Sequence, residues 1–111
     1  MSPRELREIQ ERLGDLVYTD NRIVNYLVEI ISNLRNHDDV LLGPSNRGGI
    51  YYYRISKAYA LVKGRDYVIP DDLKGLAKYV LPHRIIVKPS SRRSSEEIVE
   101  EVFSSTPVPK E

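Results

Sequence analysis

Glycine and proline divide the middle of this chain into short segments, and these breaks constrain its fold more than any other feature. Gly43-Pro44, Gly64 and Pro82 each adjoin a stretch whose apolar residues recur with helical spacing. Proline lacks the backbone donor that a helix interior needs, and glycine is favoured just past helix ends. The pattern predicts a small all-α bundle of four main helices and a short C-terminal helix.

The predicted helices are bounded by recognisable caps. Ser2 and Glu5 form a capping box at the first helix, which Gly14 ends. Thr19 and Asp20 are good caps for the second helix. The predicted elements are helices over 2–14, 21–36, 45–63 and 70–81, a short helix over 96–103, and extended segments over 17–19 and 85–87. We expect one minimal β pairing at most, between the two extended segments.

The third helix is predicted to bury one stripe of apolar side chains. The members of this stripe are Tyr51, Ile55, Ala58 and Val62, and Ala60 and Leu61 extend it. Tyr51 would then be a core residue, and Tyr52 and Tyr53 would be half-buried. Three consecutive helical residues point about 100° apart, so these tyrosines cannot form one stacking platform for bases. In the segment 85–87, all three apolar side chains are expected to be buried.

The length of 111 residues indicates one main domain. We divide the chain into a helical domain over 1–88 and a second part over 89–111. The second part consists of a polar linker or exposed loop around SSRRSS, the short C-terminal helix and a frayed tail.

Composition excludes several classes of protein. Seventeen basic residues face sixteen acidic ones, and this balance disfavours a nucleic-acid partner. The absence of cysteine excludes disulfides and thiolate metal sites. No apolar run approaches the roughly 20 residues that a membrane helix needs, and the charged N-terminus is no signal peptide. We therefore expect a cytoplasmic protein without a membrane partner.

Motifs for catalysis are missing from the chain. The sequence has no GxxxxGK[ST], HExxH or G-x-S-x-G pattern. His37 and His83 stand far apart, and a lone histidine is more often structural or on the surface than catalytic. The adjacent Asp71 and Asp72 at a helix start are typical of caps and dipole partners. We expect no metal site and no complete enzyme.

The stretch LLGPSNRGG, residues 41–49, is the candidate binding site. Gly43 and Pro44 build a turn, Ser45 or Asn46 caps the third helix, and Arg47 falls in its first turn. A cation there opposes the helix dipole, whereas a helix N-terminus attracts anions. An arginine beside it would suit phosphate oxygens. From the residues alone, Arg47 is either an ordinary surface charge or an anion contact.

Four motifs in order along the chain resemble the C-terminal lid of the MoxR-type AAA+ ATPases. That lid has a pattern close to L-G-[AP]-S-x-R, then A-x-A, then G-R-x-[YF]-V-x-P-x-D-[VL], then V-L-x-H-R. The matching residues are Leu42, Gly43, Ser45, Arg47, Ala58, Ala60, Gly64, Arg65, Tyr67, Val68, Pro70, Asp72, Leu73, Val80, Leu81, His83 and Arg84. Gly48-Gly49 departs from the family, which more often has a small residue followed by a branched one.

The resemblance implies a role for the candidate site. Arg47 falls on the second sensor arginine, which reaches from the lid to the phosphates of bound ATP. It is therefore the expected catalytic residue, and Gly43, Ser45 and Arg47 are the expected cofactor-binding residues. The phosphate loop and the Mg²⁺-binding acidic motif of the family belong to a preceding P-loop domain. We therefore expect the chain to be an inactive fragment of a longer ATPase.

The same resemblance implies partners. The lid would close over ATP bound by the N-terminal P-loop domain of the same chain, in a protein that forms a homo-oligomeric ring and acts as a chaperone-like or complex-assembly ATPase. For Arg65, His83 and Arg84 we favour structural roles, and the alternative is contact with the P-loop domain or the next subunit. The alternative function is a free-standing helical module that binds protein or, less readily, nucleic acid.

Overall fold

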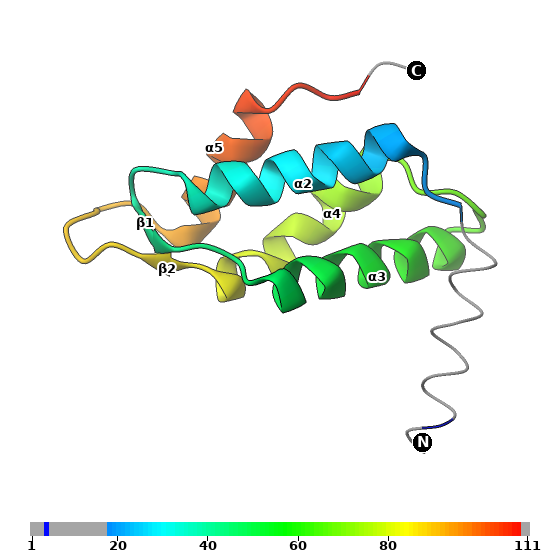
Figure 1. Ribbon diagram of the computed structural model, residues 1–111, viewed down its shortest axis with the longest axis horizontal. Coiled ribbons are helices and arrows are strands. Elements are labelled where there is room, and N and C mark those ends of the chain that lie inside the picture. The colour runs from blue at the N-terminus through cyan, green and yellow to red at the C-terminus, as the bar shows by residue number, and fades with distance from the viewer. Residues whose placement is uncertain (1–3, 5–17, 110–111) are drawn as a thin grey trace.

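The computed structural model describes Arg4 and residues 18–109. The helix predicted over 2–14 lies outside the described residues. The elements, in chain order, are α2 (Asn21–Arg35), β1 (Val40–Leu42), α3 (Asn46–Val62), α4 (Pro70–Val80), the 3-10 helix η1 (Pro82–Arg84), β2 (Ile86–Val87) and α5 (Ser95–Ser105). The all-α prediction is confirmed, with one two-stranded pairing (Figure 1).

Local caps set the helix boundaries. The side-chain oxygens of Asp20, Ser45 and Ser94 each accept a hydrogen bond from a backbone N–H two or three residues later. These bonds satisfy donors that have no partner within the helix. Gly64, just past α3, has a φ of 83°, a left-handed conformation that glycine adopts without strain. Pro70 occupies the first turn of α4, where its missing N–H is tolerated.

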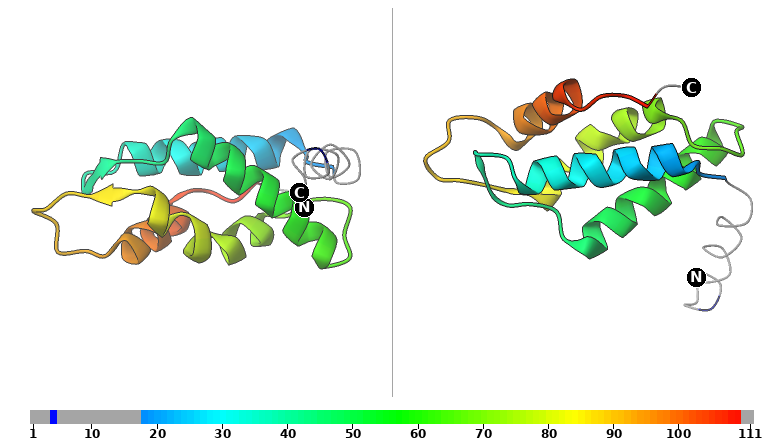
Figure 2. Two further views of the ribbon diagram at one scale, coloured as in Figure 1. Left: turned by 90° about the horizontal axis from the view of Figure 1, so that it is seen from below. Right: turned by 45° about the horizontal axis from the view of Figure 1, so that its top comes forward.

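The helices enclose one apolar core. The left view of Figure 2 shows α2 and the N-terminal half of α3 on one side of the molecule, with α4 and α5 on the other. The helix α2 contacts each of the other three helices, and α4 contacts α3 and α5. The helical part of the core consists of Ile23, Tyr26, Leu27, Ile30, Ile31, Leu34, Tyr52, Ala60, Leu73, Ala77, Val80, Ile98, Val99 and Val102. Because α5 contributes three of these side chains, it is part of the bundle's core.

The predicted buried face of α3 was wrong at Tyr51 and Val62, whereas Ala60 is buried as predicted and Ile55 packs against the core. The buried side of this helix consists of Gly48, Tyr52, Ser56 and Ala60. Tyr51 is 46% exposed and Val62 is 84% exposed. Tyr52 is buried instead, its hydroxyl donates to the Leu73 carbonyl, and burial raises its pKa. The helix therefore turns small and polar residues inward and leaves apolar side chains on its outer face.

The strand pairing also differs from the prediction. The segment 86–87 pairs antiparallel with Val40–Leu42, and not with Tyr18 or Thr19; Val17, the other residue of the predicted pairing, lies outside the described residues. Tyr18 instead forms an isolated parallel bridge with Tyr67. Ile85 is buried as expected, but Ile86 is 53% exposed because it lies on the outer side of the short pairing. The two strands connect the end of α2 to the end of α4 and so bring η1 close to the start of α3.

A buried ion pair fixes the connection between α3 and α4. The Asp72 carboxylate is almost fully buried, and its two oxygens lie 2.7 and 2.5 Å from the guanidinium nitrogens of Arg65. Asp72 also accepts a hydrogen bond from the Ile69 backbone at 2.9 Å. The hydrogen bonds to Asp72 raise the pKa of Arg65. A bidentate arginine–carboxylate pair with a further backbone donor compensates the desolvation of the carboxylate.

Asp72→Asn should destabilise the chain by about 1–3 kcal/mol, because an amide cannot accept both guanidinium hydrogen bonds. Urea denaturation followed by circular dichroism measures this difference. Asp71→Asn is the matched control, since Asp71 is the exposed neighbour in the same helical turn. Its effect should stay below about 1 kcal/mol. Equal losses for the two variants would contradict the importance of the buried pair.

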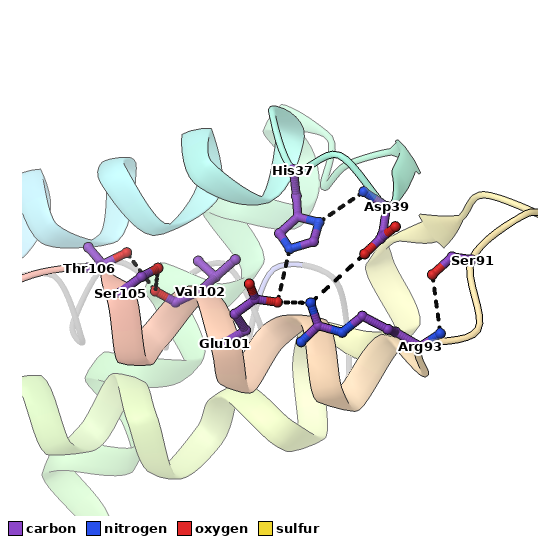
Figure 3. A network of polar contacts seen from close by, with 8 residues as sticks. All are labelled: His37, Asp39, Ser91, Arg93, Glu101, Val102, Ser105 and Thr106. Atoms are coloured by element: carbon purple, nitrogen blue, oxygen red, sulfur yellow. Dashed lines mark hydrogen bonds and ion pairs between the residues drawn. The ribbon is translucent and has the colours of Figure 1, made fainter.

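A polar network attaches α5 to the loop after α2 (Figure 3). His37 Nε2 lies 3.2 Å from a Glu101 carboxylate oxygen, and His37 Nδ1 accepts a hydrogen bond from the Asp39 N–H at 3.0 Å. Arg93 forms an ion pair with the same carboxylate oxygen of Glu101 and lies 3.9 Å from Asp39. The hydrogen bonds from His37 and Arg93 lower the pKa of Glu101. The loop around SSRRSS is thus tied to α5 through Arg93.

Glu101 should make stability depend on pH in the acid range. A carboxylate with a lowered pKa in the folded state stabilises the fold above its ordinary value of 4.5, and this contribution is lost as the pH falls through the lowered pKa. Glu101→Gln should therefore flatten the acid side of a plot of urea midpoint against pH. Glu100→Gln is the control, since Glu100 forms no ion pair among residues 18–109. An unchanged acid slope in Glu101→Gln would contradict this assignment.

Candidate functional site

The loop between β1 and α3 is held by the last residue of α2. Arg35 Nε donates to the Pro44 carbonyl at 2.8 Å, and Nη2 donates to the Asn46 side-chain oxygen at 2.9 Å. Pro44 itself is buried. One guanidinium therefore fixes both the turn and the first residue of α3, which sets the position of everything in that first turn.

Gly43 is required by the close approach of two backbone segments. A Cβ atom at this position would lie 2.7 Å from the Arg35 Cα and 2.7 Å from its Cγ. Real Cβ atoms do not approach a backbone atom so closely, so the loop would have to move. The visible role of Gly43 is thus to let the loop pack against α2.

Ser45 caps α3 as its sequence position predicts. Its hydroxyl accepts a hydrogen bond from the Gly48 N–H at 3.0 Å, and its carbonyl accepts from the Gly49 N–H at 2.9 Å. The cap leaves the first-turn backbone in a single helical geometry. Gly48 and Gly49 approach neighbours within the chain: added Cβ atoms would meet Arg84 Cδ at 3.7 Å and Ile31 Cγ1 at 3.9 Å. Both are ordinary van der Waals distances.

Arg47 is the second residue of α3 and its side chain is exposed. Within the described part of the chain, its guanidinium forms no hydrogen bond, ion pair or ring contact. Residues 40–65 contain five basic residues and no acidic one. The charge is therefore uncompensated by neighbours in sequence and opposed by the α3 dipole. A rigid loop presents a free planar cation at a helix N-terminus, an arrangement that can bind phosphate or carboxylate oxygens.

Arg84 lies beside this site, and the sequence interpretation had assigned it a structural role. It is the last residue of η1, its side chain is exposed, and its guanidinium carbon lies 5.0 Å from the centre of the Tyr51 ring. Its stem passes the first turn of α3 at Gly48. The match of Arg84 to the V-L-x-H-R motif was the signal that could have found it, but only the fold shows that η1 adjoins α3.

The other residues of the matched motifs divide by their contacts. Arg65 is engaged by Asp72, which bears out a structural role for it. His83 is exposed in η1 and has no hydrogen-bond partner among the described residues. His37 belongs to the α5 network (Figure 3). The expected site residues Gly43, Ser45 and Arg47 thus share one turn, in which the first two shape the loop and the third faces solvent.

An apolar groove runs between α2 and the start of α3. It has a volume of about 620 Å³ and is lined by Val24, Leu27, Val28, Ile31, Ser32, Arg35, Asn46, Gly49, Ile50 and Tyr53. Val28 and Ile50 are more than half exposed on its walls. With Leu61 and Val62 also exposed farther along α3, this side of the molecule carries more uncovered apolar surface than a single-faced helix would.

Neither a metal-binding cluster nor a membrane-spanning helix is found among residues 18–109. No group of three or more histidine or acidic side chains is arranged to hold a metal ion. No helix in this part of the chain has the length and apolar character needed to span a membrane.

Comparison with known proteins identifies the domain. Residues 32–102 match the family model described as the AAA lid domain. The chain belongs to this family. The lid is 42% identical over 106 residues to the uncharacterized protein YeaC of Bacillus subtilis (strain 168), a match that covers 93% of the lid chain and 32% of YeaC. It is 28% identical to the chaperone MoxR1 of Mycobacterium tuberculosis (strain ATCC 25618 / H37Rv) over 78% of the lid chain and 31% of MoxR1.

Solved structures place the lid in the same class. A crystal structure of a protein assigned as an ATPase, from Cytophaga hutchinsonii ATCC 33406, superposes with a TM-score of 0.82 and 27% identity. The match covers 93% of the lid chain and 34% of that protein. The lid is thus of the MoxR type of AAA+ proteins. It spans about a third or less of the length of the relatives it matches.

Two glycine substitutions test how the loop is built. Gly43→Ala should destabilise the lid by about 1–3 kcal/mol, because the new methyl group overlaps the Arg35 backbone. Gly49→Ala should instead stabilise it by up to about 1 kcal/mol, since alanine favours a helix and the methyl group has room. Thermal and urea denaturation measure both. A neutral Gly43→Ala would show that the loop can withdraw from α2 at no cost.

Proposed function

We propose that this lid closes over ATP held by a P-loop domain, and that Arg47 contacts the phosphates. The observation that carries the proposal is the free guanidinium of Arg47, which belongs to the first turn of α3 and has no partner among the described residues. Membership in a family of ATPase lids supplies the ligand class. Arg35, the last residue of α2, instead uses Nε and Nη2 for structural hydrogen bonds to the loop and the start of α3.

The chemistry of phosphoryl transfer explains what such an arginine does. Catalysis of this reaction consists mainly of positioning groups and stabilising charge on the transferred phosphoryl oxygens. Arg47 would bind those oxygens in cis, while an arginine finger would come from a neighbouring subunit. Gly43 and Ser45 would serve the ATP site by fixing the loop and the first turn of α3. Mg²⁺ would be held by acidic residues of the P-loop domain.

The proposed partners follow from what surrounds the site. The relatives are about three or more times as long as this chain, which leaves room for a P-loop domain in the full protein. The exposed apolar side chains on the outer face of α3 are surface that such a domain, or a neighbouring subunit of a ring, would cover. A chaperone-like activity for the full protein rests on the name of the relative MoxR1.

The second candidate is a free-standing protein-interaction module, which the apolar groove between α2 and α3 favours. The two candidates differ in one observation on the gene. A reading frame that continues upstream of Met1 into a GxxxxGK[ST] motif supports the ATPase lid. A stop codon directly upstream would favour the module.

In the full-length ATPase, Arg47→Ala should lower the hydrolysis rate of ATP by about 10²-fold or more, because one charge-stabilising donor is removed from the transition state. The rate is measured by phosphate release at saturating ATP. Removing an uncompensated charge near the positive end of α3 should leave the lid's stability unchanged or raise it by about 0.3–1 kcal/mol.

Arg54→Ala is the control for this experiment, since Arg54 is exposed on the same helix two turns beyond Arg47. Its hydrolysis rate should stay within about threefold of wild type, because it lies outside the first turn where the α3 N-terminus acts. A full-length Arg47→Ala variant with wild-type turnover would refute the proposed role of Arg47. A large loss of lid stability in that variant would show that Arg47 is structural.

A further inference from the structure

We propose that Arg84 is a second phosphate-binding arginine, held in position by Tyr51, and that it binds the same polyphosphate as Arg47. The identity of the anion rests on the proposed function, whereas the pairing of the two cations rests on the fold. One arginine belongs to α3 and the other to η1, 37 positions later in the chain.

Packing on both sides fixes the path of the Arg84 side chain. Its stem rests on α3 at Gly48, where a Cβ atom would be 3.7 Å from Cδ and 4.0 Å from Cγ. Its guanidinium lies 5.0 Å from the centre of the Tyr51 ring. The backbone below it is anchored, since Leu81 is fully buried and accepts a hydrogen bond from the Arg84 N–H at 2.9 Å. Arg84 is therefore directed across the first two turns of α3.

This path brings Arg84 to the face that carries Arg47. Arg47 and Tyr51 are four residues apart on α3, so they are neighbours on one face of the helix. Because Arg84 lies on Tyr51, both guanidiniums border the same patch of surface. Neither has a carboxylate within 4.0 Å among the described residues, and the ion pairs of those residues involve other cations.

The contact with tyrosine suits an anion-binding arginine. A guanidinium on an aromatic ring is held by cation–π attraction. Its N–H groups still point outward in the guanidinium plane, and these donors bind phosphate oxygens in pairs. Two fixed guanidiniums on one patch match the several oxygens of a polyphosphate. A lysine could not reproduce the planar donor edge.

Tripolyphosphate is the probe for this site, because it carries the phosphate chain of ATP without the base. Titration of the ¹⁵N-labelled 111-residue chain should shift the Gly48 and Gly49 amide signals. Arg47→Met and Arg84→Met should each weaken the affinity by about fivefold or more, as expected for the loss of charge-assisted hydrogen bonds. Arg84→Lys should weaken it too. Lys63→Met, which removes a positive charge at the far end of α3, should change it by less than about twofold, because that charge lies well beyond a Debye length from the first turn.

Variants of Tyr51 test separately whether its ring positions Arg84. Tyr51→Phe keeps the ring and should keep the affinity, whereas Tyr51→Leu should lower it by about as much as Arg84→Met. The Arg84 Nε–H signal reports the ring directly and should shift in Tyr51→Leu but not in Tyr51→Phe. Amide spectra of each variant establish that it remains folded.

Three results would overturn the proposal. These are wild-type affinity in Arg84→Met, an equal loss in Lys63→Met, and absence of tripolyphosphate binding by the wild-type chain. Wild-type affinity in Arg84→Met, together with weakened binding in Arg47→Met, would leave the proposed function of Arg47 intact. Conversely, wild-type ATP turnover in full-length Arg47→Ala would end that function while the titration still reports on Arg84.

Discussion

The position of the candidate site depends on the contact between the end of α2 and the loop before α3. The Arg35 guanidinium binds the Pro44 carbonyl and the Asn46 side chain, and its backbone leaves room only for a glycine at position 43. These contacts decide where α3 begins and in which direction its first turn faces. A shift of one residue would rotate Arg47 by about 100° and turn it away from Arg84. Arg47, which has no partner among the described residues, is therefore positioned by the hydrogen bonds that Arg35 donates to the loop.

The helix α3 shows why periodicity could locate a helix but not its buried face. Its ends agreed with the prediction to within one residue, because Ser45 and Gly64 act locally. Its inner face carries Gly48, Tyr52, Ser56 and Ala60, which a hydrophobic pattern does not favour. Ser56 is acceptable inside because its hydroxyl donates to the Tyr52 carbonyl at 2.8 Å. A helix with apolar residues on two sides gives no unique phase, and the choice depends on neighbours distant in sequence.

Long-range contacts account for the other errors. The β pairing was predicted between two segments that looked extended, and no strand was predicted over 40–42, because only three residues form β1. An acidic partner for Arg65 could have been predicted, since an acid and a nearby arginine lie within one motif. The adjacency of η1 and α3 could not be predicted from the sequence, because it depends on how α4 crosses the bundle. For the same reason the sequence placed Arg47 in a first turn but gave no sign of its neighbour on Tyr51.

The arginines of this lid fall into two groups by physical criteria. Arg35 donates to the Pro44 carbonyl, and Arg65 donates to the buried Asp72 carboxylate. Loss of either arginine would leave these acceptors without that donor. Arg47 and Arg84 donate no hydrogen bond within the described residues, and both lie near the positive end of α3, which disfavours a cation; only Arg84 has a compensating contact, with the Tyr51 ring. Residues that oppose the local field without compensation are expected where function requires them. The packing of Gly48 and Tyr51 against Arg84 further restricts a side chain that would have more rotamer freedom in water. Such restriction favours binding, because an ordered donor loses less entropy when the anion arrives.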